Sequence, residues 1–521
     1  MSSKIDAPTP RPAGARRWLW PALFFVVGAL ITAGVFALLM NIAQRKQEAT
    51  QPNFQVVQLT DTSFDPAEWG KNFPAQYEGW KNTSINESET SLRTPAPTDP
   101  AAPKDVAPSK LKADPRLVTM WQGYAFSVEY NEPRGHAYML SDQQLVKRVQ
   151  PPFKQPGACL NCHTSLPEVL NKIGGDPAAA WATMNKMPYT DATKLASHPV
   201  SCIDCHEPTT MKLRVSRPAF IAGIKEYKAG QGIANFDVNT MATNNEMRAY
   251  VCAQCHVEYY FKGDAKTLTF PWDKGLTVNN ALDYYDEIGF SDFTNTLTGA
   301  KVVKAQHPDF ETWSQGIHAA NGVTCADCHM PYTKQGAVKV SDHRVGSPLR
   351  DEQKINTTCL TCHHQTEAEM KSRVEKIQSI WKQQSSYSFD ALDQLIRDIS
   401  AAKTAGNVNP EWVAAAQQWQ RKAQFLQDYT VSENSKGFHA PQYSLSIINE
   451  VTDAARRGQL ALKGITEPVT TDATKYTPLI ATPAPSTTTA TPATPVATPS
   501  APATPTPLHP VYSPRPTTSP S

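Results

Sequence analysis

The segment Cys159-Leu160-Asn161-Cys162-His163 is the first of five Cys-X-X-Cys-His pentapeptides in this chain. The other four occupy residues 202–206, 252–256, 325–329 and 359–363, so that the five segments contain all ten cysteines. This pentapeptide is typical of covalent attachment of c-type haem, in which two thiols hold the macrocycle and the adjoining histidine becomes an axial ligand of the iron. The pattern therefore predicts five haem c groups. The expected attachment residues are Cys159, Cys162, Cys202, Cys205, Cys252, Cys255, Cys325, Cys328, Cys359 and Cys362, and the expected proximal ligands are His163, His206, His256, His329 and His363.

Zinc sites, redox dithiols and structural disulfides are the other uses of paired cysteines. Zinc needs two such pairs or distant histidines, and none of these uses requires a histidine directly after every pair. The five motifs begin at the uneven positions 159, 202, 252, 325 and 359, which argues against a structural repeat. We expect a mainly α multihaem cytochrome c with little β-structure and a core filled by haem.

Long helices are predicted after the last motif. Thr366 and Glu369 form a capping box, and apolar residues then recur at helical spacing, resuming after a polar break. Gly406 can end this segment, and Asn409 followed by Pro410 can begin a second helix. A third helix is expected over about residues 444–462. Their wide apolar faces suit either a core or a subunit interface.

Near the N-terminus, residues 18–43 form an uncharged stretch flanked by basic residues. A signal-peptide core has about 7 to 15 apolar residues, whereas about 20 are needed to span a bilayer. We therefore expect a transmembrane anchor, with a cleaved signal segment as the alternative. More positive charge precedes the stretch than follows it, so residues 1–17 are expected to form a cytoplasmic tail with the body on the periplasmic side of the cell membrane.

The remaining chain divides by composition. Residues 44–110 are expected to be a tether, 111–464 the catalytic domain, and 465–521, rich in Pro and Thr, a disordered tail. The net charge of +2 indicates no particular partner, and we expect no nucleic-acid binding.

Eight of the thirteen histidines lie outside the motifs. A haem that only carries electrons is best held by two axial ligands, whereas a catalytic haem needs one open position. His509 lies in the predicted tail, and His364 and His198 are expected to have surface or structural roles. If four of the remaining five serve as distal ligands, one haem stays open and one histidine is free. The five are His136, His307, His318, His343 and His439.

Three longer segments together resemble the ammonia-forming cytochrome c nitrite reductases, and the resemblance covers about residues 55–460. The first is Cys252-Ala-Gln-Cys-His-Val-Glu-Tyr-Tyr-Phe261. The second is Lys304-Ala-Gln-His-Pro308, followed by Trp313, Gly316 and His318. The third combines Trp121-Gln-Gly-Tyr-Ala-Phe126 with Pro133-Arg-Gly-His136.

The resemblance implies a distal histidine for four of the haems and none for the first, which His163 holds. His307 is then left free beside this open haem. The implied pairs of distal and proximal ligands are His136 with His256, His318 with His206, His343 with His329, and His439 with His363.

The resemblance also implies the six-electron reduction of nitrite to ammonium. Arg148, Tyr259 and His307 are the implied catalytic residues, with Arg134 as the alternative arginine and His307 acting as an imidazolium. A calcium ion is implied at Glu258 and Gln306, completed by the backbone carbonyls of Tyr259 and Lys304. Members of this family usually form homodimers through their C-terminal helices and take electrons from a membrane cytochrome that oxidises quinol.

His163 is a departure from the family, because most members have lysine as the proximal ligand of the first haem. This difference leaves open the preference among nitrite, hydroxylamine and sulfite. The competing hypothesis is a membrane-anchored electron carrier, in which His307 or a lysine caps the first haem and no substrate is reduced.

Overall fold

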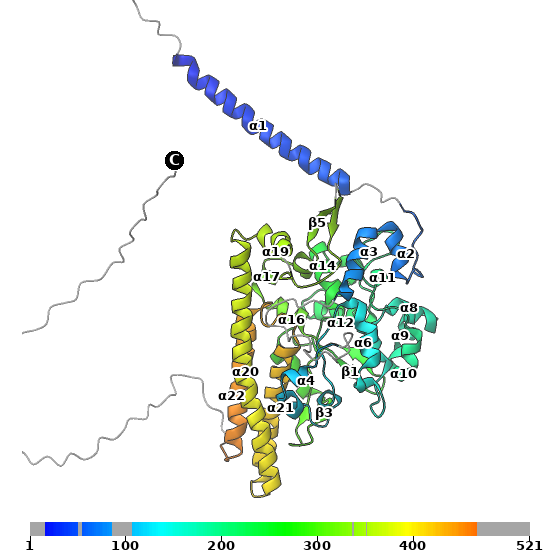
Figure 1. Ribbon diagram of the computed structural model, residues 1–521, viewed down its shortest axis with the longest axis vertical. Helices are drawn as coiled ribbons and strands as arrows, with labels where there is room; N and C mark the ends of the chain where they lie inside the picture. The colour runs from blue at the N-terminus through cyan, green and yellow to red at the C-terminus, as the bar shows by residue number, and fades with distance from the viewer. Residues whose placement is uncertain (1–15, 50–54, 86–106, 336–337, 351, 466–521) are drawn as a thin grey trace, which may run out of the picture. The chain divides into compact units, whose positions relative to one another are not determined.

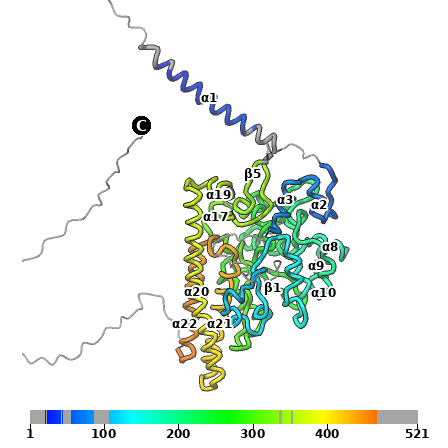
Figure 2. Tube along the Cα trace, viewed as in Figure 1, coloured from blue at the N-terminus to red at the C-terminus, as the bar shows by residue number. Residues whose placement is uncertain are grey.

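The structure is a computed structural model that describes residues 16–49, 55–85, 107–335, 338–350 and 352–465 (Figures 1 and 2). It consists mainly of α-helices, as predicted. The helices before the first motif are α1 (Arg16–Ala49), α2 (Pro66–Asn72), α3 (Pro74–Lys81), α4 (Lys110–Ala113), α5 (Arg116–Met120) and α6 (Met139–Leu145). Those from the first motif to the fifth are α7 (Leu160–His163), α8 (Leu166–Ile173), α9 (Pro177–Lys186), α10 (Tyr189–Ala192), α11 (Cys202–Cys205), α12 (Pro218–Gly230), α13 (Val238–Met241), α14 (Asn244–Ala253), α15 (Val278–Glu287), α16 (Asp309–Ser314), α17 (Ile317–Ala320), α18 (Cys325–His329) and α19 (Glu352–Thr358). Those after the fifth motif are α20 (Glu367–Ala405), α21 (Pro410–Ser432) and α22 (Pro441–Ala461).

Apart from three isolated bridges, the β-structure of the described residues consists of three antiparallel two-stranded sheets. They pair β1 (Tyr260–Lys262) with β2 (Thr267–Thr269), β3 (Phe293–Thr294) with β4 (Lys301–Val302), and β5 (Tyr332–Gln335) with β6 (Val338–Ser341). Strand β1 begins directly after Tyr259 and strand β4 ends shortly before His307. Two of these small sheets thus lie next in sequence to the predicted catalytic residues.

Helix α1 contains the apolar stretch. Residues Leu23–Asn41 have a mean hydropathy of 2.6, and none of them is buried by other parts of the chain. This helix is long and apolar enough to cross a membrane, although a signal sequence near the N-terminus would have the same properties.

The prediction of a tether over residues 44–110 is wrong for its described middle part. Asp65 caps α2 by accepting a hydrogen bond from the backbone N–H of Ala67, and Trp69 of this helix packs against Ile203 in a hydrophobic cluster. Trp80 of α3 donates its indole N–H to the carbonyl of Val200 at 3.0 Å. Residues 55–85 therefore belong to the body that contains the second motif, because their aromatic side chains supply buried surface that a linker would lack.

The C-terminal helices agree closely with the sequence prediction. Thr366 and Glu369 form the capping box of α20, and Gly406 ends this helix in the left-handed conformation with φ 65°. Asn409 caps α21, which begins with Pro410. The polar break in the apolar pattern does not interrupt this helix, since α20 is continuous over 39 residues. Figure 1 shows α20, α21 and α22 side by side, and Leu395, Ala416 and Ala455 pack together between them.

The predicted tail falls on residues that the structure does not describe, apart from its first residue, Ile465.

Candidate active site

A single cavity of about 2670 Å³ brings the five motifs together. All ten cysteines and all five motif histidines line it, and no cysteine forms a disulfide. The same cavity is lined by His136, His307, His318, His343 and His439, whereas His198 and His364 do not line it. The structure thus separates the histidines into the same two groups that the sequence predicted.

Four of the five motif histidines have a defined partner at Nδ1. His163 donates to the carbonyl of Met139 at 3.1 Å, His206 to that of Met211 at 2.9 Å, and His329 to that of Gly346 at 3.2 Å. His256 instead contacts a carboxylate oxygen of Asp309 at 3.1 Å. Since a carbonyl can only accept, Nδ1 carries the proton and Nε2 is free to bind a metal.

Three histidine rings from outside the motifs face motif histidines across the cavity. The ring centroids are 6.2 Å apart for His206 and His343, 6.4 Å for His318 and His363, and 6.3 Å for His329 and His439. Such a separation fits two imidazoles on opposite sides of one metal ion, whose bonds to nitrogen are about 2 Å long. The residues present therefore fit iron ligated by two histidines.

The expected pairings of His318, His343 and His439 are wrong. Each of these rings faces a different motif histidine from the one that the family resemblance implied. The reason is topological: the loops that carry the three residues are brought to the cavity by packing, and their order in the sequence does not determine which motif they meet.

The pairing of His136 with His256 is compatible with the structure. Burial, with a smaller contribution from the nearby charge of His256, lowers the pKa of His136 to about 4.

The first motif has different surroundings. Among the described residues, no histidine ring faces His163 as the three rings above face their partners. Burial lowers the pKa of His163 to about 4, and the positive charge of Arg148 contributes to this shift. Arg148 also acts on Cys159, and its guanidinium lies 5.1 Å from the ring centre of Phe126.

The other two predicted catalytic residues line the cavity near the same motif. Burial lowers the pKa of His307 to about 3, with a contribution from His163. Burial also raises the pKa of Tyr259 well above its usual value, and the neighbouring thiols of Cys162 and Cys159 add to this effect. Without substrate, burial therefore favours the neutral forms of His307 and Tyr259. The imidazolium expected of His307 concerns the state with the anion bound and stays a prediction.

Arg134, the alternative arginine, is engaged elsewhere. Its Nε donates to Asp142 at 2.9 Å, and its guanidinium lies 3.7 Å from the ring centre of Tyr138. The carboxylate and the aromatic face hold the side chain in place. Of the two arginines, Arg148 is the one whose charge acts on both His163 and Tyr259.

Glu258 connects the loops that carry Tyr259 and His307. Its carboxylate is fully buried and accepts hydrogen bonds from the hydroxyl of Tyr285 at 2.8 Å and from the backbone N–H of Gln306 at 2.6 Å. The side-chain amide of Gln306 lies 3.3 Å from the carbonyl of Lys304. Burial raises the pKa of Glu258 well above its usual value, so a cation is the natural partner for its ionised form.

The side chain of Lys304 does not enter this group. Its Nζ pairs with Asp428 at 2.9 Å, and both side chains are buried. The ammonium of Lys304 is thus engaged by Asp428, and the calcium-ligand role expected of the Lys304 carbonyl stays a prediction.

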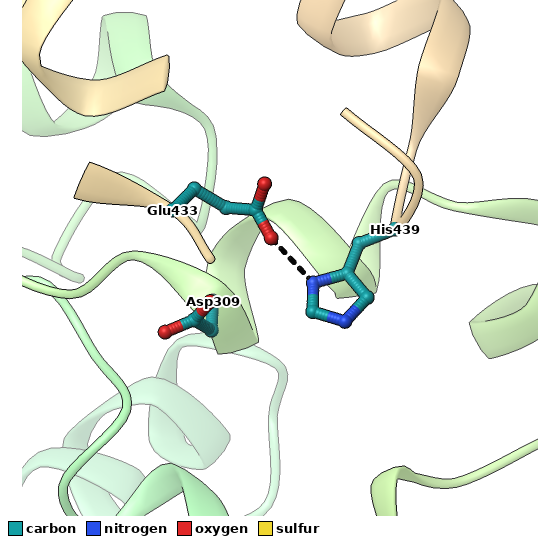
Figure 3. Close-up of side chains that lie close together, drawn as sticks. All are labelled: Asp309, Glu433 and His439. Atoms are coloured by element: carbon teal, nitrogen blue, oxygen red, sulfur yellow. Dashed lines mark ion pairs between the residues drawn. The ribbon is translucent and has the colours of Figure 1, made fainter. Parts of the chain in front are cut away.

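Sequence reasoning missed two carboxylates that contact histidines of the cavity, shown in Figure 3 with one of these histidines. Asp309 contacts His256, and Glu433 forms an ion pair with Nδ1 of His439 at 2.5 Å. Asp309 follows His307 by two residues and could have been suspected from this proximity. Nothing in the sequence around Glu433 indicates its role.

Arg217 is a third residue that sequence reasoning missed. Its guanidinium donates to the carbonyl of Asn161 at 3.0 Å and to that of Thr164 at 2.9 Å, and it pairs with Asp204. This buried arginine therefore connects the backbone of the first motif to a residue within the second.

Comparisons with known proteins agree with this geometry. Residues 65–500 match the family model described as cytochrome c552. The chain is 35% identical to cytochrome c-552 of Parabacteroides distasonis, covering 85% of each chain. It is 37% identical to cytochrome c-552 of Porphyromonas gingivalis, covering 75% of this chain and 74% of the relative.

A solved structure shares the fold. It is the catalytic subunit of cytochrome c nitrite reductase from Desulfovibrio desulfuricans, a protein with two calcium sites. The TM-score is 0.67 at 27% identity, covering 79% of this chain and 88% of the other. The mainly α architecture seen here is that of a multihaem cytochrome c nitrite reductase.

Proposed function

Since this chain belongs to the cytochrome c552 family, we propose that it is an exported pentahaem cytochrome that reduces nitrite to ammonium at its first haem. The observation that carries this proposal is the asymmetry of the cavity. Three motif histidines face a second histidine ring, and a fourth, His256, lies near His136. The first motif is instead close enough to Arg148, Tyr259 and His307 for their charges to interact with its residues. An electron carrier has no need of these three groups at one of its haems.

Conversion of nitrite to ammonium consumes six electrons and eight protons. When bound, the haem held by Cys159, Cys162 and His163 would supply the iron that takes the substrate nitrogen, and the other four haems would supply the path for electrons. The residues of the chain bind the anion, exclude water and deliver protons.

Arg148 provides positive charge for an anionic substrate, since its charge acts on both His163 and Tyr259. Tyr259 stays protonated because its pKa is raised by burial, so its hydroxyl can donate a hydrogen bond to an oxygen of nitrite. His307 is neutral until the anion arrives. A bound negative charge raises the pKa of this imidazole, so binding is coupled to uptake of a proton that His307 can then pass on.

We also propose a calcium ion at Glu258, Gln306 and the carbonyl oxygens of Tyr259 and Lys304. A buried carboxylate, an amide and main-chain carbonyls form the oxygen-rich donor set that calcium prefers. Because the oxygen and nitrogen of a glutamine amide are assigned and not observed, the side chain of Gln306 can present its oxygen to the ion. The ion would hold together the two loops that carry Tyr259 and His307.

Helix α1 is proposed as the membrane anchor. The periplasmic catalytic domain is then the body that follows it, from about residue 55 to residue 464, and it includes α2 and α3. The electron donor is then a quinol-oxidising cytochrome of the same membrane. We further propose a homodimer through the C-terminal helices, because Tyr387 of α20 does not line the cavity and exposes 56% of its surface. His163 in place of the usual lysine makes relative activity with hydroxylamine and sulfite a property to be measured with this protein.

The deciding experiment measures ammonium formed per nitrite consumed by the purified protein with a reduced viologen as electron donor. We expect one ammonium per nitrite, together with one high-spin haem in five by electron paramagnetic resonance. A protein with five low-spin haems and no nitrite consumption would instead be an electron carrier.

The variant His307→Ala tests the site itself. Loss of one preorganised donor to a developing charge typically lowers turnover by about 10² to 10³-fold, and we expect a loss of that size with the haem content unchanged. His198→Ala is the matched control, because His198 pairs with Glu168 and does not line the cavity. Near-normal ammonium formation by His307→Ala would contradict the assignment.

A further inference from the structure

The motif histidines differ in the chemical nature of their Nδ1 partners. His163, His206 and His329 donate to neutral main-chain carbonyls, whereas His256 contacts the carboxylate of Asp309. Among the cavity histidines outside the motifs, His343 contacts the carbonyl of Ser341 at 2.9 Å. His439 contacts a carboxylate, that of Glu433.

The two carboxylates lie together at one point of the cavity. Ligand atoms of Asp309, Glu433 and His439 are all within 4.8 Å of one another, and Figure 3 shows Glu433 directed at the ring of His439. Asp309 comes from α16 and Glu433 from the residue that ends α21, so the cluster joins two distant parts of the sequence.

The backbone holds both side chains in place. Asp309 accepts hydrogen bonds from the backbone N–H of Asn434 at 2.8 Å and from the side-chain amide of Asn434 at 3.0 Å. Glu433 accepts from the backbone N–H of Ser435 at 2.9 Å and from its hydroxyl at 2.8 Å. Residues 433–435 therefore hold both carboxylates in the orientations in which they contact His256 and His439.

A carboxylate and a carbonyl have different effects on a histidine bound to iron. The negative charge draws the Nδ1 proton, which makes the imidazole a stronger electron donor and favours the ferric state. Both carboxylates are buried, where a charge acts more strongly than in water. A histidine that donates to a carbonyl lacks this additional negative charge.

We propose that Asp309 and Glu433 are positioning residues that lower the reduction potentials of two haems, those ligated by His256 and by the facing pair His329 and His439. These two haems would then pass electrons on readily, and Asp309 would connect them, because it contacts His256 and lies beside Glu433. The inference rests on the proposed haem ligation. It adds to the proposed path for electrons that these two haems have lower reduction potentials than they would have without the carboxylates.

Redox titration of the complete haem-loaded protein, without nitrite, tests this inference. Asp309→Asn keeps an oxygen that can accept from Nδ1 and removes only the charge. Loss of such an outer partner typically changes the properties of a metal site by 10-fold or more. We expect the equilibrium between the ferric and ferrous forms of one haem to shift 10-fold toward the ferrous form. This shift corresponds to a change of about +59 mV in the reduction potential of a one-electron couple.

Glu433→Gln should raise the reduction potential of a different haem by a similar amount. The double variant should show both shifts. Glu168→Gln is the matched control, because Glu168 contacts His198 at the same distance of 3.1 Å as Asp309 contacts His256. We expect no haem reduction potential to change in this control variant.

Five unchanged potentials in Asp309→Asn and Glu433→Gln would overturn the inference, and so would equal shifts in the control. If Asp309→Asn fails to fold, Glu433→Gln alone decides, since it acts on the other haem. Nitrite reduction is measured separately, so normal turnover with unchanged potentials would refute only this inference.

Discussion

At the scale of single residues, Arg217 shows how a haem-attachment motif is supported by the rest of the chain. Its side chain is 1% exposed, and it pairs with Asp204, whose side chain is equally buried. It also donates hydrogen bonds to two carbonyls, that of Asn161 in the first motif and that of Thr164 directly after this motif. One buried cation thus satisfies acceptors from two motifs that are about forty residues apart in the sequence.

Substitution of Arg217 by Met should destabilise the protein strongly. It leaves the carboxylate of Asp204 buried without its cation, which typically costs about 3–5 kcal/mol. The free energy of unfolding from urea denaturation measures this effect. Arg248→Met is the control, because Asp327, the partner of Arg248, is 43% exposed and such a pair contributes about 1 kcal/mol or less. Equal losses in the two variants would contradict the role given to Arg217.

Histidine ligands illustrate what a residue type alone can predict. The five cavity histidines outside the motifs can be identified because the two others in the described chain have surface or structural settings. Their partners cannot be deduced in this way, because an imidazole has the same chemistry opposite any of the five motifs. Three pairings taken from the family resemblance are therefore open to error, and the structure corrects them.

At the scale of elements, a close contact between two loops positions His318 and His439. A Cβ atom added to Gly316 would lie 2.1 Å from the carbonyl oxygen of His439. Gly316 directly precedes α17, which carries His318. The absence of a side chain at this position lets the loop before α17 touch the loop before α22.

We expect Gly316→Ala to separate these two loops and to weaken axial ligation by His318 and His439. The change would appear as conversion of low-spin haem to high-spin haem in electron paramagnetic resonance. Gly230→Ala is the control, since a Cβ atom there meets nothing within 4 Å. An unchanged low-spin signal in Gly316→Ala would show that the loops tolerate the methyl group.

The long helices can be predicted well because their signals are local. The capping box at Thr366, the left-handed glycine at position 406 and the Asn409-Pro410 start act within one turn of the helix. Helices α2 and α3 escape such a prediction, since their stability depends on packing Trp69 and Trp80 against residues near the second motif.

At the scale of the whole molecule, the body is built around its cavity. Close-packed protein interiors contain few voids larger than a water molecule, whereas this cavity has a volume of about 2670 Å³. The apolar and histidine-lined space therefore needs haem as part of the core.

The chain produced without haem attachment should accordingly lack fixed tertiary structure. We expect near-UV circular dichroism to lose its native signals, while far-UV signals of the C-terminal helices are partly kept. The haem-loaded protein, produced in the same host with haem attachment intact, serves as the reference. Native near-UV signals in the haem-free chain would contradict a core that depends on haem.

The amino-acid sequence by itself determined the class of the protein and the long C-terminal helices, and it predicted five haems with their attachment residues. These features depend on covalent chemistry or on contacts within a few residues. Only the tertiary structure decided which histidine ring faces which motif, and only it placed Asp309 against His256, Glu433 against His439 and Arg217 against the first motif. Those properties arise from burial and from contacts between distant loops, which no local pattern of residues encodes.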